Sequence, residues 1–161
     1  MILTTSRKPG KRTRRLAKIL ARFFNWYYVQ RGKTSIKEFD ANFAIIQEVK
    51  GNPGILKIYN SGEVAFSLKF TLGETNKVKV GRETPVFFGK LPFNVYCLSY
   101  FNSLSANEKF SRKVAISISS PKSVFVRRRD EKLIFELKYN NKLVARLISR
   151  ERWIQCKIGS R

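Results

Sequence analysis

The residues with the clearest chemical potential are the lysines and arginines of the first 37 positions. Eleven Lys and Arg occur before Glu38, with no Asp or Glu among them. The stretch TTSRKPGKRTRRLAK at 4–18 adds four hydroxyl side chains and the pair Pro9–Gly10. Lys, Arg, Ser and Thr side chains, together with backbone N–H groups at helix starts, make most protein contacts to phosphate. This stretch is therefore typical of a phosphate-binding surface.

The charge of the whole chain supports a polyanionic partner. The 161 residues include 33 Lys and Arg against 11 Asp and Glu, which gives a net charge of +22 at pH 7. Such a charge gives information about binding partners and not about the fold, and it favours nucleic acids or anionic membranes as partners. No stretch approaches the roughly 18 consecutive apolar residues of a membrane-spanning helix. An Arg-rich start also suits an organelle transit peptide, but the remaining chain is equally basic, so we expect a nucleic acid and no membrane partner.

Catalytic chemistry has little support in the sequence. Histidine, the commonest general base and metal ligand, is absent. The carboxylates are scattered, and the pairs Glu38/Asp40 and Asp130/Glu131 do not have a spacing that predicts acid–base catalysis or a metal site. The segment RGKTS at 31–35 lacks the upstream glycine of a P-loop. We therefore expect no catalytic residue, metal site, cofactor or small-molecule substrate.

The two cysteines, Cys97 and Cys156, stand far apart and in no CxxC pattern. This spacing predicts neither a metal site nor the disulfide framework of a small secreted domain. We interpret them as buried, inert thiols in a reduced compartment, which predicts a cytoplasmic protein.

Three clusters of cations are candidate contacts to nucleic acid. The first lies on an N-terminal loop and the helix expected after it, where the helix dipole adds a positive bias. The second surrounds Gly32, and the third is a run of three arginines. In order, the clusters are Arg7, Lys8, Lys11, Arg12, Arg14, Arg15, Lys18 and Arg22; Arg31 and Lys33; Arg127, Arg128 and Arg129. In the third cluster, alternation along a strand lets at most two arginines face one ligand, and a solvated hairpin tip is the alternative.

The first half of the chain predicts alternating strands and helices. MILTT at 1–5 reads as a strand, and 12–25 as a helix with an apolar stripe at Leu16, Ile19, Leu20 and Phe23. A second stripe on that helix is cationic and lacks acidic i,i+4 partners, which favours a bound ligand. WYYVQ at 26–30 predicts a strand, and Thr34 or Ser35 can cap a short helix that runs to about residue 43. AIIQEVK at 44–50 predicts a strand, GNPG at 51–54 a tight turn, and 55–72 a hairpin.

The second half is richer in strands. NSLSANEKF at 102–110 suggests a helical turn or short helix, and ETPVFFGKLPFNVY at 83–96 is ambiguous. Strands are expected for VAISIS at 114–119, SVFVRR at 123–128, KLIFELKY at 132–139 and LVARLIS at 143–149. The boundary between the halves is expected within 73–85. Together the two halves predict an α/β fold.

Motifs for DNA recognition are not visible: we find no helix-turn-helix, zinc-finger or basic-zipper pattern, nor the aromatic RNP motif of one RNA-binding class. Three segments nevertheless resemble the archaeal Brix-domain proteins, which are related to eukaryotic ribosome-assembly factors. They are LTTSRKPGKRTRRLAK at 3–18, YVQRGKTS at 28–35 and GNPGILKIYNSGEVAFSL at 51–68. Their order and spacing over about seventy residues carry the resemblance.

The resemblance implies one Brix domain over 1–161. Its halves, about 1–76 and about 77–161, would be mixed α/β units similar to each other and to the anticodon-binding domains of some aminoacyl-tRNA synthetases. It also implies a non-catalytic factor that binds pre-ribosomal RNA, and other ribosome-assembly proteins, during ribosome biogenesis and rRNA processing. By position, it supports Arg7, Lys8, Arg12, Arg14, Arg31 and Lys33 as RNA contacts. Two alternatives stay open: a structural ribosomal protein, and a basic module that docks on an acidic protein.

Overall fold

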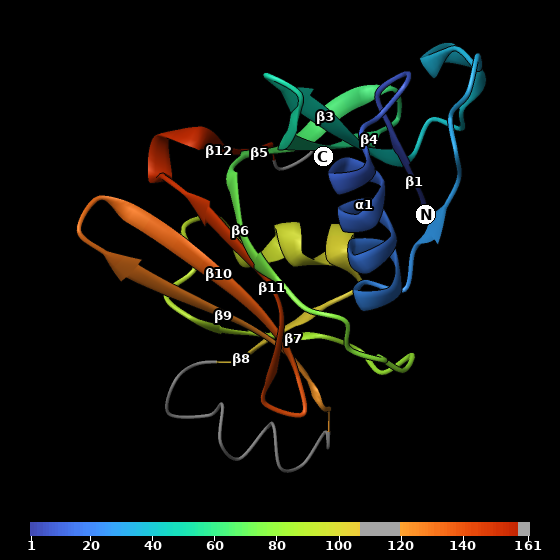
Figure 1. The fold of residues 1–161 in the computed structure, drawn as a ribbon. Coiled ribbons are helices and arrows are strands. Elements are labelled where there is room, and N and C mark those ends of the chain that lie inside the picture. The colour runs from blue at the N-terminus through green and yellow to red at the C-terminus, as the bar shows by residue number, and fades with distance from the viewer. Residues whose placement is uncertain (107–119, 158–161) are drawn as a thin grey trace.

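The computed structural model describes residues 1–106 and 120–157, which form two six-stranded mixed sheets and a 13-residue α-helix (Figure 1). The first sheet has the strand order β12-β5-β4-β3-β1-β2, and the second has the order β6-β11-β10-β9-β7-β8. The first sheet consists of β1 (Ile2–Thr5), β2 (Tyr27–Tyr28), β3 (Phe43–Val49), β4 (Asn52–Asn60), β5 (Glu63–Lys69) and β12 (Ile154–Cys156). The second consists of β6 (Thr71–Thr75), β7 (Val86–Gly89), β8 (Leu104–Ala106), β9 (Lys122–Arg129), β10 (Lys132–Tyr139) and β11 (Lys142–Ser149). The expected α/β class is confirmed.

The α1 helix (Lys11–Phe23) has an apolar stripe on one face and a cationic stripe on another, both at the spacing of three and four residues that a helix requires. Its apolar stripe is buried, with Leu16, Leu20 and Phe23 each fully inaccessible to solvent. Burial of each such side chain stabilises the fold by about 1.5–3 kcal/mol. A helix of this length is marginal on its own, so packing against the sheets supplies its stability. The helix begins and ends within two residues of the predicted range.

The first sheet departs from the sequence prediction at its turns. Lys50 and Gly51, with φ of 52° and 76°, form the β3–β4 turn, and β4 already begins at Asn52. The turn predicted at 51–54 is therefore displaced, because two successive positive φ angles suit a two-residue hairpin turn. The helix predicted before residue 43 is only a 3₁₀ turn, η1 (Ile36–Glu38). Ser35 caps η1 in a capping box with Glu38.

The second sheet contains the strands predicted at 123–128, 132–139 and 143–149, as β9, β10 and β11. Residues 104–106 form β8 and not the predicted helical turn, because they pair in parallel with β7. Residues 107–110 of that prediction and the strand predicted at 114–119 lie outside the described residues. The ambiguous segment 83–96 contains β7 and the start of η2 (Val95–Phe101), a 3₁₀ helix that Figure 1 shows between the two sheets.

The two sheets exchange strands along the chain: β6 follows the strands of the first sheet but belongs to the second, and β12 follows the strands of the second sheet but belongs to the first. The run expected to continue the first hairpin divides after Lys69: β5 stays in the first sheet, and β6 pairs with β11 in the second. Conversely, the C-terminal β12 follows η3 (Glu151–Trp153) and pairs with β5 in the first sheet. One hydrophobic cluster is continuous across both sheets. Within it, the Phe101 ring of η2 lies 5.1 Å from Phe24 and 5.0 Å from Phe66.

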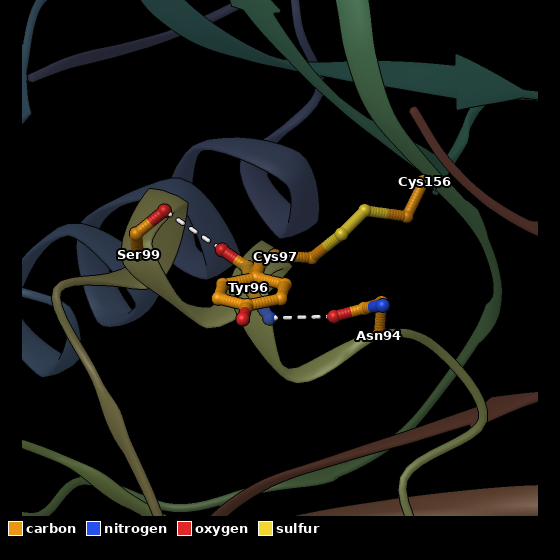
Figure 2. Close-up of a disulfide and its surroundings, with 5 residues drawn as sticks. All are labelled: Asn94, Tyr96, Cys97, Ser99 and Cys156. Carbon is orange, nitrogen blue, oxygen red and sulfur yellow. Dashed lines mark hydrogen bonds between the residues drawn. A yellow bond between two sulfur atoms is a disulfide. The ribbon is translucent and has the colours of Figure 1, made fainter. Parts of the chain in front are cut away.

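Cys97 and Cys156 form a disulfide, so the prediction of free thiols is wrong (Figure 2). Their Cα atoms lie 6.5 Å apart, within the usual range for a disulfide. Cys97 belongs to η2, whose first turn is capped by the side-chain oxygen of Asn94, while Cys156 belongs to β12. The sequence did not indicate this pairing because strand exchange brings together residues that are 59 positions apart. The bond fastens the C-terminal strand to η2.

The disulfide should contribute strongly to stability. Closing a loop of this length lowers the conformational entropy of the unfolded chain, which raises the free energy of unfolding by up to about 4 kcal/mol. We expect the double variant Cys97→Ala, Cys156→Ala to lose up to that amount in the free energy of urea unfolding. A reductant should destabilise the unmodified protein but not the variant. Thiol titration in denaturant, before reduction, should find no reactive sulfur, and two reactive thiols per chain would contradict the assignment.

Candidate nucleic-acid interface

The exposed face of α1 carries a continuous row of cations. Lys11, Arg15, Lys18 and Arg22 recur at spacings of three and four residues, so they share one side of the helix, and all four are exposed. From the first to the last, the row extends about 16 Å along the helix axis at 1.5 Å per residue. The predicted cationic stripe is therefore present as a surface.

A groove of about 760 Å³ lies between this face of α1 and the segment that follows β6, residues 76–80. Figure 1 shows this segment passing beside the end of α1. Among the residues that the structure describes, seven cations and no acidic residue line the groove. The cations are Lys11, Arg14, Arg15, Lys18 and Arg22 on the helix, with Lys77 and Lys79 on the segment. The remaining lining residues are Ile19, Asn76, Val78, Val80 and Val144.

Lys77 and Lys79 are the site residues that sequence reasoning missed. In NKVKV at 76–80 both lysines are exposed, while Val78 and Val80 are partly buried against the core. This alternation is the signal that could have indicated a surface with one apolar and one cationic side. The segment lies within the boundary expected between the two halves at 73–85, and its lysines belong to none of the three predicted clusters.

The segment is anchored at both ends. At its start, the Asn76 backbone N–H donates to the carbonyl of Val144 at 3.0 Å, and the Asn76 side chain donates to the Leu143 carbonyl at 3.1 Å. Three residues after its end, the Glu83 carbonyl accepts a hydrogen bond at 3.2 Å from the side chain of Asn25, which lies just beyond α1. The Tyr139 hydroxyl donates to the Glu83 carboxylate at 2.9 Å, and this hydrogen bond raises the tyrosine's pKa. Both anchors hold the segment beside the helix.

Lys122, at the start of β9, caps the C-terminus of α1 from inside the protein. Its Nζ donates to the carbonyls of Arg22 at 3.2 Å and Phe23 at 2.9 Å, and to the side chain of Asn25 at 3.2 Å. The last carbonyls of a helix lack intrahelical partners and carry partial negative charge, which suits a cation. Burial lowers the pKa of Lys122 to about 8, although the nearby Glu83 carboxylate opposes this shift.

Glu48, near the end of β3, caps the N-terminus of α1. Its Oε1 accepts the Gly10 N–H at 2.7 Å and the Thr13 hydroxyl at 2.6 Å. The sequence indicated a helix start open to phosphate, but Glu48 takes that position. Any phosphate at this surface must therefore be held mainly by side chains.

Arg12 has contacts within the protein. Its guanidinium donates to the Asn52 side chain at 3.2 Å and to the Leu72 carbonyl at 3.2 Å. It thereby ties the first turn of α1 to β4 and to β6. Its role as an RNA contact stays a prediction.

Four further predicted residues lie at one edge of the first sheet. β1 is parallel to β2 and β3, so the loops after β1 and β2 emerge at the same edge, where α1 also begins. Arg7 and Lys8 lie in the first loop and Arg31 and Lys33 in the second. Arg31 also donates to the Thr34 carbonyl at 3.0 Å. These cations extend the charged surface beyond the Lys11 end of the groove.

The arginine run at 127–129 lies apart, at the end of β9. Arg127 donates to the buried Glu136 at 2.9 Å. Burial alone would raise the pKa of Glu136, but the Arg127 hydrogen bond and the charges of Arg127, Lys138 and Arg146 hold that pKa below its usual value. Arg128 pairs with Glu151 at 2.8 Å on the surface. Two of the three arginines therefore have acidic partners, whereas none of the ion pairs between described residues involves a cation of the groove.

Within residues 1–106 and 120–157, no three potential metal ligands come together. The same part of the chain contains no helix long and apolar enough to cross a membrane.

Comparison with known proteins gives relatives of one kind. The chain is 48% identical to a probable Brix domain-containing ribosomal biogenesis protein from Archaeoglobus fulgidus over 116 residues, which are 70% of this chain and 76% of that protein. A protein of the same description from Methanococcus maripaludis is 52% identical over 63 residues, 37% of this chain and 38% of that one. No protein-family model matches the sequence.

Solved structures share the fold. The crystal structure of Mil, an archaeal Imp4-like protein, superposes with a TM-score of 0.72 at 22% identity and covers 98% of this chain and 100% of that one. A probable ribosomal biogenesis protein from Aeropyrum pernix gives a TM-score of 0.59 at 18% identity and covers 99% of this chain and 96% of that one. At these identities the likeness concerns the fold alone.

Substitution of Lys122 tests how α1 is held. Lys122→Met keeps most of the apolar volume but leaves two helix carbonyls without their donor, which should cost about 1–3 kcal/mol of unfolding free energy at pH 7. The lysine's pKa is lower folded than unfolded, so between about pH 8 and 10 the unfolded chain binds more protons and stability rises with pH. The gap between the unmodified protein and the variant should therefore widen, by about 1–2 kcal/mol from pH 7 to 9.5.

Urea unfolding at both pH values measures this gap. Lys132→Met, at an exposed position in β10, is the matched control and should show no widening. A gap that stays constant or narrows with rising pH would contradict the buried, cation-disfavouring environment of Lys122.

Proposed function

The chain belongs to the Brix domain-containing ribosomal biogenesis proteins of archaea, and on this ground we propose that it binds ribosomal RNA during ribosome assembly without catalysing a reaction. Pre-ribosomal RNA is its principal partner, and other assembly proteins are further partners that such a role involves. A cytoplasmic location follows from the proposal, because archaeal cells have no nucleus. The disulfide is compatible with it, since some intracellular proteins of heat-loving archaea contain disulfides.

The groove beside α1 is the observation that carries RNA binding. Within residues 1–106 and 120–157, seven cations and no carboxylate line it, so the field of these residues attracts a polyanion. Each phosphate that a Lys or Arg neutralises releases condensed counterions, which makes the binding entropically favourable and dependent on salt. The cations of the loops after β1 and β2 extend this surface at one end.

The roles of the carboxylates support a non-catalytic protein. Glu48 caps a helix, Glu136 neutralises arginines and Glu83 anchors a segment. Each of these three carboxylates is already engaged in a structural hydrogen bond or ion pair, and the sequence contains no histidine. Incubation of purified protein with RNA and divalent metal should give neither cleavage nor modification.

Two alternative functions would also explain the positive charge, but they predict different behaviour in sedimentation. A structural ribosomal protein would remain in mature ribosomes and polysomes, whereas an assembly factor leaves before translation. A basic module for an acidic protein would sediment in complexes that resist nuclease. Sucrose-gradient profiles of archaeal lysates, with and without RNase, separate these three. We expect the protein in pre-ribosomal fractions that nuclease disperses.

The groove makes a specific prediction for RNA affinity. The triple variant Arg15→Gln, Lys18→Gln, Lys79→Gln removes cations from both of its sides. We expect the affinity for a ribosomal RNA fragment to fall on the order of tenfold or more at moderate salt. The slope of log K against log salt should decrease in magnitude by about 2, at 0.7–0.9 per lost phosphate contact. Fluorescence anisotropy over a salt series measures both quantities.

A matched triple variant controls for net charge. Lys90→Gln, Lys132→Gln, Arg152→Gln removes three exposed cations that do not line the groove, and we expect less than half of the slope change. The variant Arg127→Gln, Arg128→Gln, Arg129→Gln should also lose less, because Glu136 and Glu151 already partner two of its arginines. Equal losses in all three variants would mean that binding follows net charge and not the groove.

A further inference from the structure

The disulfide between Cys97 and Cys156 links elements that belong to different parts of the fold (Figure 2). Cys97 lies in η2, whose residues Leu98 and Phe101 are buried in the core that both sheets share. Cys156 is the last residue of β12, the outermost strand of the first sheet. The bond therefore attaches the edge of a sheet to the interior of the protein.

Among the residues that the structure describes, the contacts of β12 are few and largely exposed. The strand has three residues, and its partner in the sheet is β5. Just beyond the strand, the Lys157 N–H donates to the Ala65 carbonyl at 2.8 Å. Gln155 is exposed and Ile154 is only partly buried, so docking of the strand removes little apolar surface from water. Edge segments with few buried contacts open at low cost.

The η3 turn that leads into β12 is also held by surface interactions. The Lys69 Nζ lies 5.1 Å from the centre of the Trp153 ring, and the Arg150 guanidinium lies 5.5 Å from it. Glu151 pairs with Arg128 at 2.8 Å, and both side chains are more than half exposed. Exposed cation–π contacts and ion pairs each contribute little to stability. The disulfide is therefore the strongest of these attachments of the C-terminal strand.

The disulfide can be approached from solvent. Cys156 is partly exposed, whereas Cys97 is buried. A second groove of about 760 Å³, which we call the η2 groove, is lined by η2 residues that include Tyr96, Cys97 and Tyr100, and by Lys157 on the far side of the bond. An incoming thiolate therefore reaches Cys156 first, while the interior protects Cys97.

We propose that this disulfide is a site of reversible thiol–disulfide exchange, where a dithiol oxidoreductase of the Cys-X-X-Cys type reduces the bond and thereby releases β12. A thiolate of the dithiol attacks the Cys156 sulfur, the S–S bond breaks, and Cys97 leaves as a thiolate that takes up a proton. The second thiol of the dithiol then attacks the mixed disulfide. Two electrons and two protons pass to this chain, which ends with two thiols, and the dithiol ends as a disulfide. The oxidised form of the same reagent reverses the step.

The setting of the bond agrees with such a role. In most intracellular proteins a disulfide is transient and serves catalysis or redox sensing. Release of β12 would also be a local change. The other edge of β5 remains paired with β4 along the whole strand. The Phe66 ring of β5 stays held in the core, 5.0 Å from Phe101 and 5.3 Å from Phe93. Reduction therefore opens one edge of the first sheet and leaves its centre in place.

Hydrogen exchange of the full chain, with and without dithiothreitol and in the absence of denaturant, tests the release. We expect the amides of residues 154–157 to exchange at least about tenfold faster in the reduced protein. The amides of β10, in the middle of the second sheet, should stay protected in both states during the first minutes. Unchanged exchange at 154–157 would overturn the proposal. Equal loss of protection in β10 would do the same, because it would show general unfolding.

Two variants assign the effect to the bond. Cys97→Ser, Cys156→Ser should exchange like the reduced protein whether or not dithiothreitol is present. The matched control is Ser105→Ala, which changes an exposed residue of the η2 groove and keeps both cysteines. It should respond to the reductant as the unmodified protein does. A response to dithiothreitol that persists in the variant without cysteines would contradict the proposal.

The rate of reduction separates an exchange site from a bond that only the unfolded chain exposes. Thiols are labelled at intervals after the native protein is mixed with a Cys-X-X-Cys oxidoreductase. We expect a rate proportional to the oxidoreductase concentration and unchanged within about twofold by urea below the unfolding transition. A rate that rises steeply with urea would follow the unfolded population. That result would identify a purely structural disulfide and overturn the proposal.

Discussion

The position of α1 depends on two charged side chains that cap its ends. Glu48 accepts the Gly10 N–H at the first turn, and Lys122 donates to the carbonyls of Arg22 and Phe23 at the last. Each charge has the sign that the helix dipole favours at that end. The two groups come from different sheets, so the helix is fixed relative to both. Because its termini are satisfied internally, the exposed face needs no further partner and is free to carry cations.

The fold tolerates the clustered cations because the free energy gained by burying apolar side chains exceeds the repulsion between the charges. Two unit charges about 6 Å apart in water repel by about 0.7 kcal/mol, and salt at physiological strength screens charges beyond about 8 Å. Three such neighbouring pairs along α1 cost about 2 kcal/mol at most. Burial of Leu16, Leu20 and Phe23 contributes about 5–9 kcal/mol on the same helix. The fold therefore tolerates a stripe whose repulsion a polyanion would relieve on binding.

Patterns in the sequence predicted the helices and strands that depend on interactions between residues close together in the chain. The α1 helix follows from its two stripes, and the strands at 132–139 and 143–149 from alternation and β-rich composition. Long-range choices were beyond the sequence. Nothing near Lys69 indicates that the chain changes sheet there, and nothing near Cys156 identifies Cys97 as its partner. The same limit applies to the site: the cations of α1 were evident, but Glu48 and Lys122 reach the helix ends only through tertiary packing.

The exchange of strands explains why the groove lies where it does. The first strand of the second sheet, β6, leaves the first sheet directly after β5, so the segment that follows it starts next to β11 and passes α1. One side of the groove thus comes from a helix packed on the first sheet, the other from a segment tied to the second, and Val144 of β11 lies between them. The groove exists only when both sheets are packed together. Arg12, which donates to the Leu72 carbonyl of β6, and the disulfide between η2 and β12 reinforce that packing from two sides. The cationic surface is thus divided between elements held by two interlocked sheets, and its shape depends on how those sheets pack.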